Sequence, residues 1–128
     1  MANFFDLLAR IFISSIFLLS GYNKIFNYIG TVSWMEGFGV PGFLLAPTIV
    51  LEIILPILII IGYKTRLAAA LLCIFSITTA VIFHLDFGDQ MQTIQLLKNF
   101  GLAGGFLFIA VNGPKEWAIE TERKYVRL

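Results

Sequence analysis

Residues 43–63 read FLLAPTIVLEIILPILIIIGY, an apolar run long enough to cross a bilayer as a helix. One carboxylate, Glu52, interrupts the run near its middle. A charge at that depth costs several kcal/mol in lipid, so Glu52 is expected to face protein or water and to have a partner. Pro56 follows four residues later, and its ring removes the hydrogen bond that the Glu52 carbonyl would accept in a regular helix. Side chain and backbone together predict a polar point in the middle of a transmembrane helix.

The composition extends this prediction to the whole chain. Hydrophobic residues make up 59% of the 128 residues and charged residues 13%, whereas soluble domains average about a quarter charged residues. Long apolar runs without strict alternation favour helices over barrel strands. We predict an all-α protein, an integral membrane four-helix bundle that forms one domain. Its expected helices cover 4–26, 43–63, 66–85 and 94–112, and a short polar tail, 113–128, is expected to form an interfacial helix.

The loops indicate an orientation in the membrane. Lys and Arg concentrate in the turn between the second and third helices and in the tail, at Lys64, Arg66, Lys115, Arg123, Lys124 and Arg127. The other two loops carry acidic residues and no Lys or Arg. Since positive charge stays on the cytoplasmic side, both termini are expected to be cytoplasmic. The long first loop, with Trp34 and Phe38, is expected either at the membrane interface or folded over the outer mouth of the bundle.

The first helix carries a stripe of polar and small residues. Its members are spaced by three or four residues and so share one face: Asp6, Arg10, Ser14, Phe17, Gly21 and Lys24. Such a stripe is expected to face the bundle. Close helix packing explains Ser14 and Gly21, but packing has no need of two cations.

Depth in the membrane suggests a partner for Glu52. At about 1.5 Å per residue, Arg10 lies roughly 9 Å and Glu52 roughly 16 Å from the inner ends of their segments, an offset that a long arginine side chain can bridge. We therefore predict a contact between Arg10 and Glu52, direct or through water, with Asp6 as the competing partner of Arg10. The pair is either a structural tie that fixes helix register or a functional proton or ligand site.

A second polar cluster is predicted at the outer ends of the helices. Its members are Lys24, His84, Asp86, Lys98 and Asn99. Histidine ordinarily changes charge near neutral pH and suits proton exchange. Lys and Asn offer donors for a carbonyl or an oxyanion. Ordinary snorkelling and capping at a membrane boundary is the alternative explanation.

Other functional classes lack residues to support them. The single cysteine, Cys73, excludes an internal disulfide and a Cys-x-x-Cys redox pair. With one histidine and no ligand cluster, we expect neither a metal site nor haem from this chain alone. Nothing in the charge pattern indicates nucleic-acid binding. Gly101 and Gly105 form a G-x-x-x-G pair suited to packing within the bundle or to a homodimer.

These residues together resemble the DoxX family over most of the chain. The resemblance rests on an ordered set at helix-consistent positions: Arg10, Phe17, Ser20-Gly21, Lys24, Glu52, the turn from Gly62 to Arg66, His84 and Lys98-Asn99. Small residues often follow the family's second-helix glutamate, whereas this chain has Ile53, Ile54, Leu55 and Pro56.

The resemblance implies a small four-helix prokaryotic protein of the cytoplasmic (inner) membrane, crossing it several times. Some members are membrane subunits of thiosulfate:quinone oxidoreductase, and others are linked to redox-stress complexes. The residues it carries over as a site are Arg10, Lys24, Glu52, His84, Lys98 and Asn99.

Our preferred hypothesis from sequence is a quinone-linked redox subunit in the lipid bilayer, with quinone as cofactor. Phe-rich helices would hold the ring. Lys98, Asn99 and Lys24 are the expected quinone-binding residues, and Glu52, His84 and Arg10 are the expected catalytic residues that move protons. Electrons would come from a soluble or membrane partner subunit. Two alternatives stay open: a non-catalytic anchor or assembly factor for a soluble redox partner, and a small-solute carrier that dimerises through Gly101 and Gly105.

Overall fold

A computed structural model describes residues 1–119 of the chain, and these residues contain helices and no strand. The helices are α1 (Ala2–Phe26), α2 (Tyr28–Glu36), a 3-10 turn η1 (Gly42–Leu44), α3 (Leu45–Ile61), α4 (Thr65–Phe83) and α5 (Gln90–Asn112). Four segments are long and apolar enough to cross a membrane: Ala2–Phe26, Gly42–Ile61, Thr65–Phe83 and Gln90–Asn112. The predicted helical membrane bundle is confirmed.

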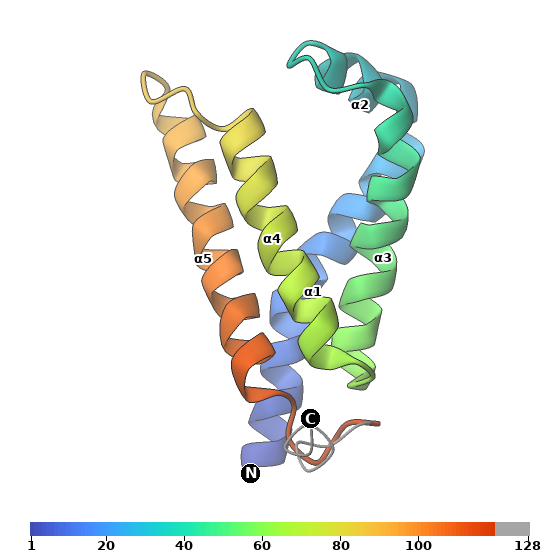
Figure 1. Cartoon of the computed structure of the whole chain (residues 1–128), viewed down its shortest axis with the longest axis vertical. Helices are drawn as coiled ribbons and strands as arrows, with labels where there is room; N and C mark the ends of the chain where they lie inside the picture. The colour runs from blue at the N-terminus through green and yellow to red at the C-terminus, as the bar shows by residue number, and fades with distance from the viewer. Residues whose placement is uncertain (120–128) are drawn as a thin grey trace.

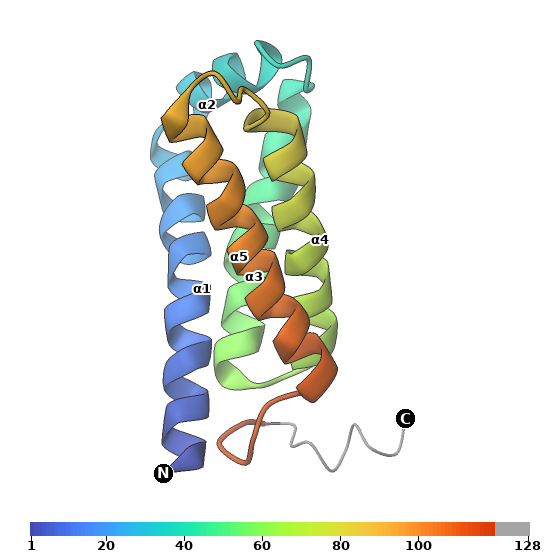
Figure 2. The same cartoon turned by 90° about the vertical axis from the view of Figure 1, so that its left-hand side faces the viewer.

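The helices pack as two pairs. Helix α1 lies along α3, and α4 lies along α5, while α3 and α4 meet less extensively (Figure 1). The pairs converge at the end that carries the turn between α3 and α4, and they diverge toward α2. We call the first the basic end, after Lys64 and Arg66, and the second the α2 end. Helix α1 begins, and the described chain finishes, at the basic end (Figure 2).

Local sequence explains where the helices end. Helix α3 stops at Gly62, whose φ of +78° is the left-handed conformation that glycine adopts without strain. Helix α5 begins after Asp89, whose carboxylate accepts a hydrogen bond of 2.9 Å from the Met91 amide. It finishes at Asn112, and Gly113 caps it just before Pro114, which cannot continue a helix.

The buried core lies where the two pairs meet. Phe17 of α1 packs its ring against Phe106 of α5 and Phe75 of α4, with centroid separations of 5.5 and 6.0 Å. Small residues on α4, including Ala68 and Ala69, let the helices approach closely around these rings. Large apolar side chains on the outer faces remain exposed, as they do in a protein whose solvent on those faces is lipid.

Residues 27–42, expected as a loop, contain the helix α2. Its sequence, YIGTVSWME, places Tyr28, Val32 and Met35 at helical spacing, but nine residues are too short a stretch for periodicity to decide. Tertiary contacts order it instead: Trp34 stacks on Phe83 of α4 at 4.5 Å between centroids, and Phe38 packs edge-on against the same ring. These contacts fold the segment over the mouth of the bundle, and a place at the membrane interface stays a prediction.

The described part of the tail, residues 113–119, does not form the expected interfacial helix. Residues 116–119 follow a series of bends, and residues 120–128 lie outside the described part. The Ile119 amide donates to the Ile61 carbonyl at 3.0 Å, which ties this segment to the end of α3.

The G-x-x-x-G pair is divided between two environments. A Cβ added at Gly105 would meet Ile13 of α1, whereas one added at Gly101 would meet nothing within 4 Å. Gly105 thus serves packing within the bundle, and a homodimer through this face stays a prediction.

Gly21 provides a test of the contact between α1 and α3. A Cβ there would lie 2.8 Å from Ile53 Cγ1 and 3.4 Å from Glu52 Cβ, so Gly21→Leu forces the two helices apart. We expect it to lower the free energy of unfolding by about 1–3 kcal/mol, the usual cost of overpacking. Gly104→Leu is the matched control because its Cβ meets nothing within 4 Å. Thermal unfolding in detergent gives the comparison, and equal midpoints for the two variants would contradict this packing.

Candidate functional site

A cavity of about 400 Å³ lies between the two helix pairs toward the α2 end, and all five α-helices contribute to its wall. The wall is mainly apolar and aromatic, with Phe17, Phe75, Phe83 and Trp34 among its members. Its polar side chains are Ser20, Lys24, Thr31, Thr48, Glu52, Thr78, Thr79, His84, Gln95 and Asn99. A mostly apolar wall with a limited set of polar groups is typical of small-molecule sites, which range from about 300 to 1,000 Å³.

Glu52 pairs with Lys24 in the wall of this cavity. The Lys24 ammonium donates to both carboxylate oxygens, at 2.7 and 2.8 Å, and to the Ser20 hydroxyl at 2.9 Å. These bonds use all three donors of the ammonium group. The Glu52 side chain is 3% exposed and that of Lys24 is 24% exposed, so the carboxylate is the deeper partner.

Gly21 makes this pairing possible. It is buried between Ser20 and Lys24 on the face of α1 that meets α3, and its missing side chain leaves room for Ile53 and for the Glu52 Cβ. Side chains on a helix lean toward its N-terminus, so Lys24 reaches back from the end of α1 toward the depth of Glu52. The α1–α3 contact therefore positions both members of the ion pair.

The predicted contact between Arg10 and Glu52 is wrong. Arg10 is 1% exposed and lies level with the last turn of α3, where it donates to the Ile59 and Ile60 carbonyls at 3.0 and 2.7 Å. Those carbonyls have no partner within the helix and carry the negative end of its dipole. Arg10 also bonds Asp6 at 3.0 Å, as the competing pairing predicted, and the Trp117 carbonyl.

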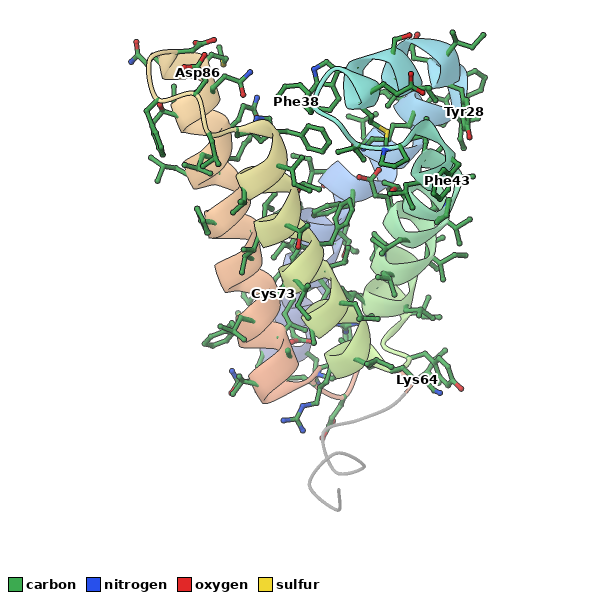
Figure 3. The ribbon with its side chains drawn as sticks, turned by 45° about the horizontal axis from the view of Figure 1, so that its top comes forward. Tyr28, Phe38, Phe43, Lys64, Cys73 and Asp86 are labelled. Atoms are coloured by element: carbon green, nitrogen blue, oxygen red, sulfur yellow. The ribbon has the colours of Figure 1, made fainter. Side chains whose placement is uncertain are left out.

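Of the second polar cluster predicted from sequence, some residues line the cavity and others lie outside it. Lys24, His84 and Asn99 line the cavity, and the Asn99 amide donates to the Thr79 hydroxyl at 3.3 Å. Lys98 is exposed and is absent from the wall, since adjacent residues point about 100° apart on a helix. Asp86 lies out on the loop between α4 and α5 (Figure 3), where it accepts from the Gly88 amide.

Sequence reasoning missed the partner of His84. The His84 Nδ1 atom lies 2.6 Å from Gln92 Oε1, and because a carboxamide oxygen only accepts, Nδ1 donates. The other ring nitrogen, Nε2, makes no hydrogen bond to any residue in 1–119. Gln92, Gln95 and Asn99 are spaced by three and four residues, and this polar period at the start of α5 is the signal that could have found Gln92 and Gln95.

The chain is similar to known inner-membrane proteins. The family model described as DoxX matches residues 5–85. The inner membrane protein YqjF of Escherichia coli (strain K12) is 38% identical over 114 residues, which cover 89% of this chain and 88% of that protein. The inner membrane protein YphA of the same organism is 38% identical over 125 residues, which cover 92% and 88%. No solved structure matches the chain.

The ion pair predicts an asymmetric response to substitution. Lys24→Met leaves a 3% exposed carboxylate without its counter-charge, so we expect a loss of about 3–5 kcal/mol in the free energy of unfolding. Glu52→Gln leaves the more exposed lysine and should cost about 1–3 kcal/mol. The double variant should be more stable than Lys24→Met because no buried charge remains. Chemical unfolding in detergent measures this cycle, and a larger cost for Glu52→Gln than for Lys24→Met would refute the assignment of Glu52 as the deeper charge.

The hydrogen bonds of Arg10 indicate that this residue has a structural role at the basic end. Its guanidinium reaches four acceptors from a rigid fork, and a lysine at this position offers one point charge instead. Arg10→Lys should therefore destabilise the protein by about 3–5 kcal/mol, as expected for a broken buried network. In a Trp34→Phe background, Arg10→Lys should also make the Trp117 side chain more accessible to an aqueous quencher, so that its fluorescence is quenched more strongly. Lys98→Met is the control, and identical quenching in both variants would argue against the tie between Arg10 and the tail.

Proposed function

This chain belongs to the DoxX family and is a multi-pass inner-membrane protein, and from that premise we propose that it is the membrane subunit of a quinone-linked oxidoreductase. In this proposal the cavity at the α2 end holds the quinone head group, and a partner subunit delivers the electrons. The observation that carries the proposal is an aromatic-walled cavity of about 400 Å³ with a carboxylate–ammonium pair in its wall. The cavity opens within a bundle whose outer faces suit lipid, where quinones reside.

The residues in the wall fit a quinone ring. Phe17, Phe75, Phe83 and Trp34 offer flat apolar surfaces against which an aromatic ring packs favourably. Asn99 offers an amide donor whose present bond to Thr79, at 3.3 Å, is long and easily exchanged for a ring carbonyl. A bound quinone supplies the redox chemistry by accepting electrons and protons in equal number.

The chain's own polar residues supply and receive protons. The Lys24 ammonium and the Glu52 carboxylate share the wall with Asn99, so a proton held between them lies at the edge of the cavity. His84 uses Nδ1 in its contact with Gln92, so Nε2 is the ring nitrogen available for proton exchange on the α4 side. Arg10, expected from sequence to move protons, has no such role in this proposal because it lies at the basic end, away from the cavity.

A non-catalytic anchor for a soluble redox partner is the second candidate. The observation in its favour is the tail, which Arg10 and Asp6 hold against the basic end through the Trp117 carbonyl and the Lys115 amide. The tail and the basic end that holds it lie on the side of the membrane predicted to face the cytoplasm. The anchor requires that Glu52→Gln and His84→Ala leave activity intact while deletion of residues 117–128 abolishes it.

Quinone binding distinguishes the two candidates. In a Trp117→Phe background, Trp34 of the cavity wall is the remaining tryptophan, so its quenching reports occupancy of the cavity. We expect a short-chain quinone analogue to quench Trp34, and Asn99→Leu to weaken the apparent affinity by about 3–10-fold, since one hydrogen bond contributes about 0.5–1.5 kcal/mol. Lys98→Leu, the neighbouring exposed position, should leave the affinity unchanged.

The protein for this titration is purified with its native lipids. Absence of quenching, or equal affinities for Asn99→Leu and Lys98→Leu, would contradict a quinone site in this cavity and favour the anchor.

A further inference from the structure

A second hollow, of about 320 Å³, adjoins the cavity along α1. Its polar members are Ser20, Asn23, Lys24, Asn27 and Thr31. The two hollows share the polar residues Ser20, Lys24 and Thr31, so the groove along α1 and the cavity meet at the lysine of the ion pair.

The polar members form one face of α1 that continues into α2. Their spacings of three, one, three and four residues are those of a single helical stripe. Ile25, between them in sequence but on another face, is 48% exposed and belongs to the apolar surface that faces lipid. A polar stripe on a membrane helix is stable only where it faces protein or water.

Capping and packing do not account for the two asparagines. Asn27 stands at the start of α2 but makes no side-chain cap there. Among residues 1–119, neither the Asn23 nor the Asn27 side chain makes a hydrogen bond, and both residues are exposed. An amide left unpaired in lipid costs several kcal/mol, so these side chains require water beside them.

The groove has the length needed to reach Glu52. From Asn27 to Ser20 is seven residues along α1, or about 10 Å. From the start of α3 at Leu45 to Glu52 is also seven residues, or about 10 Å. Lys24 lines both hollows, and its side chain is 24% exposed while its ammonium bonds the buried carboxylate.

We propose that this groove is a water path that connects the α2 end with the Lys24–Glu52 pair. Its occupant is water, and it allows the buried pair to exchange protons with the aqueous phase on the side opposite the basic end. The path would serve the proton chemistry of the proposed function. It does not depend on quinone binding, and its test uses no quinone, so the two proposals fail separately.

Thiol accessibility tests the path. In a Cys73→Ala background, which removes the single native cysteine, Asn23→Cys and Ile25→Cys place thiols two residues apart at nearly the same depth. A charged, membrane-impermeant maleimide is applied separately to each side of sealed vesicles. We expect Asn23→Cys to react at least about tenfold faster than Ile25→Cys, because the reactive thiolate forms only in contact with water. The reaction should occur from the side of the α2 end.

A deeper position extends the same test. Ser20→Cys, beside the Lys24 ammonium, should react with a small cationic thiosulfonate from that side, and Asn23→Leu in the same chain should slow this reaction. Equal rates at Asn23→Cys and Ile25→Cys, or reaction only from the side of the basic end, would overturn the proposal. Size-exclusion profiles matching that of the Cys73→Ala parent establish that each variant is folded.

Discussion

The Glu52 carboxylate is buried in an apolar bundle and bonded at 2.7 and 2.8 Å to an ammonium from another helix. Neither charge could occupy that depth alone, since desolvation of a lone ion costs far more than any nearby packing returns. The pairing in turn requires α1 and α3 to approach at Gly21. The position of the cavity, its polar edge and the groove along α1 all depend on this one contact.

A second buried cation has a different role at the opposite end. Arg10 binds the carbonyls that α3 leaves without helical partners, together with Asp6 and the Trp117 carbonyl. It holds the bundle closed at the basic end, while the helix pairs diverge toward α2 (Figure 1). Aromatic stacking of Trp34 on Phe83 then covers the wider end. Hydrogen bonds of Arg10 thus stabilise the basic end, and the aromatic contacts of Trp34 cover the α2 end. The cavity lies between these two sets of contacts.

Much of this arrangement follows from sequence. Hydropathy alone places the four membrane segments, and a carboxylate in the middle of one of them requires a polar site. The partner of Glu52 was not predictable in the same way, because hydropathy locates a residue only to within a turn or two. Choosing Lys24 over Arg10 needed the register of α1 against α3 and the lean of the lysine side chain. Lys98 and Asn99 illustrate a finer limit: they are neighbours in sequence and equal in depth, and only helix rotation decides which one faces the cavity.

The central claim is that the Lys24–Glu52 pair belongs to a working redox site and is not solely a structural tie. An infrared difference spectrum, recorded on adding a quinone analogue to the lipid-embedded protein, observes the Glu52 carboxyl group directly. The account predicts a carboxyl band that changes with quinone in the native protein and is missing from Glu52→Gln. A spectrum in which no Glu52 band responds to quinone would contradict it and would make the pair a structural tie in a membrane anchor.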